Sequence, residues 1–95
     1  MTLYAVLDGK NIKPVSADEW AVWFKNPEAR RVARTEIGDR LLSTVFLGMD
    51  HGYDGKEQWF ETCLFHGSDS SVLARYATYD EAVQGHERYR QEIFG

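Results

Sequence analysis

The feature that most constrains the fold is a series of apolar segments between residues 31 and 77, separated by short polar turns. Segments 31–37, 40–49, 58–66 and 72–77 are rich in β-branched and aromatic residues, which favour β-strands. Gly38-Asp39 suits a two-residue turn, and polar loops are expected at 50–57 and 67–71. Connections this short join antiparallel strands, because a parallel pair needs a crossover of about a dozen residues. We therefore predict an antiparallel sheet in which segment 40–49, the most continuously apolar, is central.

A weaker pair of strands is expected before this series. Residues 3–7 are apolar, and Asp8-Gly9 follows them as a turn signal, since glycine tolerates positive φ. The return segment, 10–13, is polar and stops at Pro14, which cannot donate to a strand ladder. This segment is at best an edge strand.

Two helices are predicted, each opened by a capping box in which a hydroxyl and a glutamate satisfy the first backbone N–H groups. Ser16-Ala17-Asp18-Glu19 begins a helix over 16–25, which Asn26-Pro27 ends. Thr78-Tyr79-Asp80-Glu81 begins a helix over 78–94, with an apolar stripe of Tyr79, Ala82, Val83, His86, Tyr89, Ile93 and Phe94.

Together these elements predict one α+β domain spanning residues 1–95. We expect an antiparallel sheet of four or five strands, with the helices at 16–25 and 78–94 packed on one face. Such packing buries the apolar stripes of both helices and one face of the sheet.

Composition excludes several classes of function. The 95 residues include 15 acidic and 11 basic side chains, a net charge of −4, so nucleic-acid binding is not expected. The apolar runs are too short to span a bilayer, and the N-terminus lacks the pattern of a secretory signal. A single cysteine, Cys63, cannot form an intramolecular disulfide, which fits a reducing cytoplasm. We expect a cytoplasmic protein that does not enter a membrane.

Four residues could carry chemistry. Asp50 and His51 follow the central strand, and a carboxylate beside an imidazole can serve acid–base catalysis or bind metal. The same pair is also typical of an ordinary turn. His86 lies in the apolar stripe of the last helix, where histidine is more often a buried residue with one hydrogen bond to backbone or carboxylate.

Glu61 lies within an aromatic strand and needs a partner if it is buried, and Arg75 on the next strand could supply a bidentate one. A structural Glu61–Arg75 pair is the favoured interpretation. The rival interpretation is a small acid–base or metal-dependent enzyme using Asp50, His51, Glu61 and His86. That site requires the middle of the last helix to cross the loop end of the hairpin formed by 40–49 and 58–66.

Known motifs for metals and cofactors are missing from the sequence. It has no Cys-x-x-Cys pair, no His-Glu-x-x-His helix and no calcium loop with the correct spacing, so no metal or cofactor is predicted. Cys63, on a strand among aromatic residues, is expected to be inert. Arg31, Arg34, Trp20 and Arg75 are candidates for a binding surface, although charged residues also commonly protect the edge strand of a sheet.

Several segments of the chain resemble small hypothetical proteins of bacteriophages and prophages. They are STVFLGMDH at 43–51, FET at 60–62, RYAT at 75–78 and EAVQGH at 81–86, together with segments 4–8 and 20–24. Many of those proteins have a proline pair before the FET strand, where this chain has residues 56–59. Because they carry no established activity, no catalytic role is transferred from them.

The resemblance implies expression from a phage or prophage genome in a bacterial cytoplasm. It suggests an accessory protein that binds a host, phage or defence-system protein, for example a CRISPR–Cas component. A protein partner is therefore expected, and a homodimer is a further expectation. The small enzyme described above is the alternative.

Overall fold

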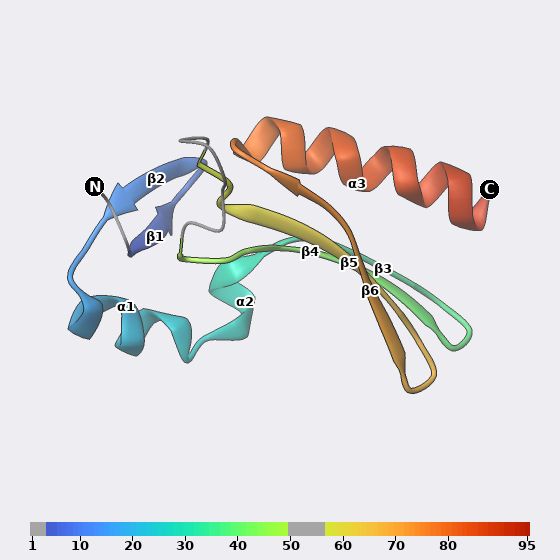
Figure 1. The fold of residues 1–95 in the computed structure, drawn as a ribbon, viewed down its shortest axis with the longest axis horizontal. Coiled ribbons are helices and arrows are strands. Elements are labelled where there is room, and N and C mark those ends of the chain that lie inside the picture. The colour runs from blue at the N-terminus through green and yellow to red at the C-terminus, as the bar shows by residue number, and fades with distance from the viewer. Residues whose placement is uncertain (1–3, 50–56) are drawn as a thin grey trace.

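The described part of the chain has two short strands and two short helices, followed by four consecutive strands and a long helix. The computed structural model describes residues 4–49 and 57–95 (Figure 1). The elements are, in order, β1 (Ala5–Asp8), β2 (Asn11–Pro14), α1 (Ala17–Phe24), α2 (Pro27–Arg30), β3 (Arg31–Ile37), β4 (Arg40–Phe46), β5 (Phe60–His66), β6 (Asp69–Tyr76) and α3 (Tyr79–Phe94). This confirms the predicted α+β class.

Strands β3 to β6 form an antiparallel sheet in which each strand pairs with the next one in the chain, in the order β3-β4-β5-β6. Gly38 and Gly67 have φ values of 61° in the turns after β3 and β5, a conformation that glycine adopts without a steric penalty. Strand β4 lies between β3 and β5, as its apolar sequence predicted. Strands β1 and β2 form a separate two-stranded hairpin.

Helix α3 covers one face of the four-stranded sheet and contacts all four strands (Figure 1). Residues on a strand alternate between its two faces, so Leu42, Thr44 and Phe46 of β4 are buried on the α3 side. The intervening residues of β4 point to the opposite face and remain partly exposed. The helix itself buries Ala82, Gly85 and His86.

The N-terminal helical region differs from the prediction of a single helix packed beside α3. Pro27 ends α1, as expected, but it also occupies the first turn of a short second helix, α2, whose cap is the Asn26 side chain. Proline suits this position because the first helical N–H has no partner within the helix. Helix α1 packs against β1 and α2, so the packing of two helices on one face is not confirmed.

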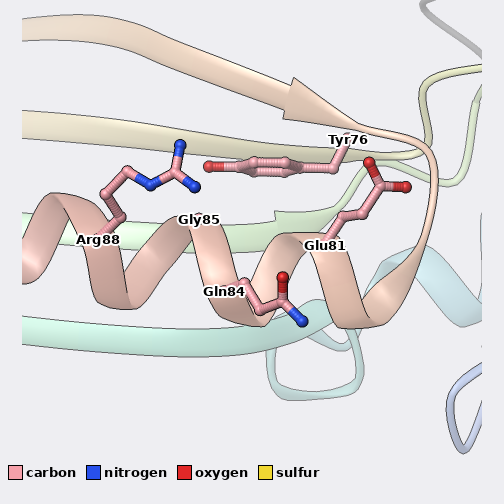
Figure 2. A pocket seen from close by; sticks show the side chains of 5 residues that line it. All are labelled: Tyr76, Glu81, Gln84, Gly85 and Arg88. Carbon is pink, nitrogen blue, oxygen red and sulfur yellow. The ribbon is translucent and has the colours of Figure 1, made fainter.

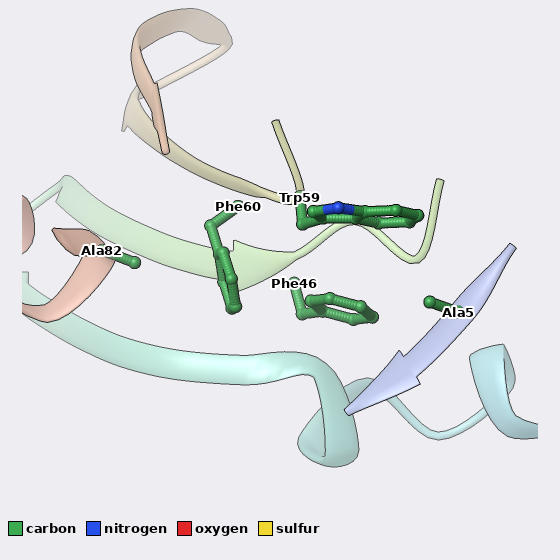
Figure 3. Packing of buried hydrophobic residues seen from close by; sticks show 5 residues of the cluster. All are labelled: Ala5, Phe46, Trp59, Phe60 and Ala82. Carbon is green, nitrogen blue, oxygen red and sulfur yellow. The ribbon is translucent and has the colours of Figure 1, made fainter. Parts of the chain in front are cut away.

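An aromatic cluster joins the N-terminal hairpin to the end of the sheet (Figure 3). The rings of Phe46 and Trp59 stack with centroids 6.0 Å apart, and Phe60 meets Phe46 edge-on at 5.2 Å. Ala5 of β1 and Ala82 of α3 close the cluster from two sides, and both are fully buried. The backbone adds a link, since the Ala5 N–H donates to the Gly48 carbonyl at 3.0 Å.

Candidate functional site

The structure separates two of the four residues proposed for catalysis. Asp50 and His51 lie outside the described residues. Glu61 pairs with Val45 across the β4–β5 ladder and therefore lies on the face away from α3. His86 contacts Thr44 on the α3 face, so the sheet stands between it and Glu61. No group of three histidine, cysteine, aspartate or glutamate side chains within 4–49 and 57–95 is placed to hold a metal ion.

The predicted pair of Glu61 and Arg75 is confirmed. Arg75 Nε donates to Glu61 Oε2 at 3.1 Å, and both side chains are partly buried. The other carboxylate oxygen accepts from the Cys63 thiol at 3.2 Å. Burial and this hydrogen bond raise the pKa of Cys63 to about 11, so the residue is a protonated thiol at neutral pH and a poor nucleophile.

Around this pair, alternate residues of all four strands form a second face of the sheet, opposite α3. Near the hairpin turns this face extends away from α1 and α2 (Figure 1), and Phe65 and Val72 are 41% and 53% exposed. We call this set of side chains the open face. The strand pairing assigns to it Arg31, Arg34, Glu36, Leu41, Ser43, Val45, Glu61, Cys63, Phe65, Ser70, Val72 and Arg75.

The four predicted binding residues do not form one surface. Arg34 lies on the open face and forms an ion pair with Glu36 at 2.8 Å, and Arg31 is exposed at the start of β3. Trp20 lies on α1, where its ring contacts Tyr4 and Phe24, so it contributes to packing. Arg31, Arg34 and Arg75 share the open face, since Arg31 pairs with Val45, whereas Trp20 lies apart from it on α1.

His86 is a buried polar residue held by two threonines rather than by the backbone or carboxylate partner that was expected. It is 4% exposed; its Nδ1 lies 2.8 Å from the Thr44 hydroxyl, and its Nε2 lies 3.0 Å from the Thr35 hydroxyl. Burial lowers the pKa of His86, so the imidazole is neutral at pH 7. A neutral imidazole carries one donor and one acceptor, and two hydroxyl groups satisfy both.

The hydrogen bonds of His86 continue through the sheet to a tyrosine. Thr44 and Thr62 are directly opposed on β4 and β5, with hydroxyl oxygens 2.6 Å apart. The Thr62 hydroxyl in turn lies 3.0 Å from the hydroxyl of Tyr76. A continuous chain therefore runs His86–Thr44–Thr62–Tyr76, and both threonines are fully buried.

Tyr76 ends this chain at a small pocket between β6 and α3 (Figure 2). The cavity has a volume of about 200 Å³ and is lined by Tyr76, Glu81, Gln84, Gly85 and Arg88. The four helical residues recur at intervals of three and four, so they lie on one side of α3. The Tyr76 hydroxyl points toward the Arg88 guanidinium, and Glu81 lies at the other end of the ring.

Sequence reasoning found His86 but missed the rest of this chain and the pocket. Thr44, Thr62 and Tyr76 are ordinary strand residues whose partners are far away in the sequence, so no spacing rule connects them.

Neither the comparisons with known proteins nor a search for membrane-spanning helices assigns a function to the chain. None of the described helices is long and apolar enough to cross a membrane. No protein-family model matches the chain, and no curated protein or solved structure is significantly similar to it.

Proposed function

We propose that this domain acts by binding a protein partner through the open face of its sheet. The observation that carries the proposal is the contrast between the two faces. Helix α3 buries one face, whereas the opposite face presents apolar side chains that are still partly exposed, among them Phe65 and Val72. Burying such side chains against a partner is favourable by about 25 cal/mol per Å² of apolar area.

The charges of the open face restrict the chemistry of the partner. Glu61 neutralises Arg75 and Glu36 neutralises Arg34, which leaves Arg31, on the edge strand, as the one basic side chain of the face without an ion pair among the described residues. Paired charges do not attract a phosphate backbone, which needs a cluster of free cations. The surface best matched to this face is therefore a protein surface that is apolar at its centre and close to neutral.

The resemblance to phage and prophage proteins supports a bacterial partner. On this proposal the domain is an accessory protein that acts stoichiometrically on a host, phage or defence-system protein, with CRISPR–Cas components among the candidates. The rival enzyme has weaker support, because Glu61 and His86 lie on opposite faces of the sheet.

A matched pair of valine substitutions tests the proposal. Val72 is 53% exposed on the open face and Val83 is 42% exposed on the outer side of α3. Proteins captured from a bacterial lysate by the wild-type domain are identified, purified and measured for direct binding to wild-type, Val72→Asp and Val83→Asp domains. We expect Val72→Asp to weaken binding at least about tenfold, because it buries an unpaired charge, and Val83→Asp to leave affinity unchanged.

Equal effects of the two substitutions, or a larger effect of Val83→Asp, would contradict the proposed surface. Analytical ultracentrifugation of the domain alone tests whether a second copy of the domain covers the open face instead. A dimer that Val72→Asp dissociates would show that a second copy covers the open face, and this result would overturn the proposal of a different partner. Thermal unfolding of both variants confirms that each is folded.

A further inference from the structure

The hydrogen-bond chain from His86 links the protonated nitrogen of this buried ring to the role of the Tyr76 hydroxyl in the pocket, as a donor or as an acceptor. Each hydroxyl has a single hydrogen, so if the two buried threonines both donate within the chain, two arrangements remain. If Nδ1 of His86 carries the proton, Nδ1 donates to Thr44, Thr44 to Thr62 and Thr62 to Tyr76. The Tyr76 hydroxyl hydrogen is then free to donate into the pocket.

The second arrangement reverses every bond. If Nε2 carries the proton, it donates to Thr35, and the Thr44 hydroxyl donates to Nδ1. Thr62 must then donate to Thr44, and Tyr76 must donate to Thr62. In this state Tyr76 offers only a lone pair to the pocket. The tautomer of His86 thus determines whether the pocket contains a hydroxyl donor or a hydroxyl acceptor.

The other polar groups of the pocket favour an acceptor as ligand. Arg88 forms no ion pair or hydrogen bond with any residue of 4–49 or 57–95, whereas its neighbour Arg90 is engaged by Glu87. A free guanidinium beside a phenol provides several donors directed at one place (Figure 2). Burial raises the pKa of Tyr76, so the phenol keeps its proton at neutral pH.

We propose that this pocket binds a small monocarboxylate, with Arg88 and the Tyr76 hydroxyl as donors, and that the bound state holds His86 as the Nδ1–H tautomer. The size of the site supports this ligand class, because about 200 Å³ is below the roughly 300–1,000 Å³ of pockets for drug-sized molecules. The charge of Glu81 at the far end disfavours a second negative group. Dicarboxylates and phosphate are therefore expected to bind less well.

Nuclear magnetic resonance on the full-length ¹⁵N-labelled domain tests the ligand class. Propionate, succinate and inorganic phosphate are titrated separately, and amide shifts are followed at the pocket-lining residues of α3. Propionate is expected to give saturable shifts with a Kd on the order of 1–10 mM, as suits a ligand of so few atoms. Succinate and phosphate are expected to bind at least a few-fold more weakly.

Two substitutions of the same kind separate the pocket from general charge effects. Arg88→Gln removes the proposed partner of the carboxylate and is expected to weaken propionate binding about tenfold or more. Arg31→Gln removes the same charge at an exposed position on β3 and is expected to leave Kd unchanged. Both side chains are exposed, so neither variant is expected to disturb the fold.

The tautomer is read directly from long-range ¹H–¹⁵N correlations of the imidazole ring. In the propionate-saturated domain we expect His86 to be protonated at Nδ1 only. Tyr76→Phe is expected to weaken binding and to make the His86 spectrum insensitive to propionate. The proposal is overturned by an Nε2–H tautomer in the saturated state, by the absence of saturable shifts, or by tighter binding of phosphate or succinate than of propionate.

Discussion

Replacing Gly85 by alanine is expected to destabilise the domain, although the same change normally stabilises a helix. A Cβ atom at this position would lie under 3.0 Å from the hydroxyl oxygen and two ring carbons of Tyr76. The tyrosine cannot move away freely, because its ring is rigid and its hydroxyl is bonded to Thr62. The glycine is therefore required for β6 and α3 to approach each other closely.

The magnitude follows from three opposing effects. Overpacking a tight contact costs about 1–3 kcal/mol, and loss of the Tyr76–Thr62 hydrogen bond costs about 1 kcal/mol more. Alanine regains about 1 kcal/mol of helix propensity. The free energy of unfolding of Gly85→Ala is thus expected to fall by about 1–3 kcal/mol. For a domain of this length that corresponds to a Tm lower by at least about 4 °C.

Urea and thermal unfolding of a double-mutant cycle provide the assay. In a Tyr76→Ala background the clash is absent, so Gly85→Ala is expected to be neutral or to stabilise by up to about 1 kcal/mol. Gln84→Ala, at the neighbouring position whose side chain is exposed at the rim of the pocket, is the control and is expected to change stability by less than about 0.5 kcal/mol. Stabilisation by Gly85→Ala alone, or an equal loss in both backgrounds, would refute the reasoning.

Three further predictions follow from other residues. Gly48→Ala is expected to lower the free energy of unfolding in urea by about 2–4 kcal/mol, because Gly48 has a φ of 75° and a Cβ there would lie under 3.0 Å from the Trp20 ring. If Gly48→Ala cost nothing in a Trp20→Ala background, the strained φ would make no contribution. Burial lowers the pKa of His86 below 6.5, so the unfolded state binds more protons, and the free energy of unfolding is expected to fall as pH drops below about 6.5. A free energy of unfolding that increases on acidification, with the His86 ring protonated at pH 6, would contradict this. With its pKa raised to about 11, Cys63 is expected to react with a thiol reagent at pH 8 roughly a hundredfold more slowly than free cysteine, and Glu61→Gln is expected to speed the reaction. Rapid labelling of the wild-type thiol would contradict the raised pKa.

Local signals in the sequence predicted most of the elements, because the forces involved act between near neighbours. The hydroxyl half of each capping box forms as expected, since Ser16 and Thr78 accept from the N–H three residues later, whereas the glutamate of each box accepts from the cap hydroxyl instead of a backbone N–H. The turn at Gly38 and the central position of β4 are also as predicted. Strand β6 begins at Asp69 rather than 72, since pairing with β5 holds polar residues in the ladder that have little intrinsic preference for a strand.

The errors arise where tertiary contacts override a repeating pattern. Val32 shares sequence parity with Arg34, so a regular strand would place both side chains on one face. A register shift between Arg31 and Ala33 breaks that alternation, so Val32 packs on the core while Arg34 is exposed. Val83 was placed on the apolar stripe of the last helix but is 42% exposed, because the centre of the buried side lies at Ala82, Gly85 and His86.

The candidate site was predictable only in part, for the same reason. A histidine in an apolar stripe indicates a buried polar group, but the identity of its hydrogen-bond partners depends on the strand register. Thr44 and Thr62 become neighbours only because β4 and β5 pair in one specific alignment. A shift of β5 by one residue would turn the Thr62 hydroxyl to the open face and break the chain between Thr44 and Tyr76.

The pairing of each strand in the four-stranded sheet with its neighbour in the chain has a consequence for how the domain folds. Two of the three ladders are closed by two-residue turns, so their contacts form with little loss of chain entropy. Topologies rich in such local contacts fold faster than sheets whose strands come from distant parts of the chain. The hairpins β3–β4 and β5–β6 can therefore form independently and early. Docking of α3, which completes the contacts of His86, then depends on both hairpins being joined in register, and it belongs to the later part of the folding reaction.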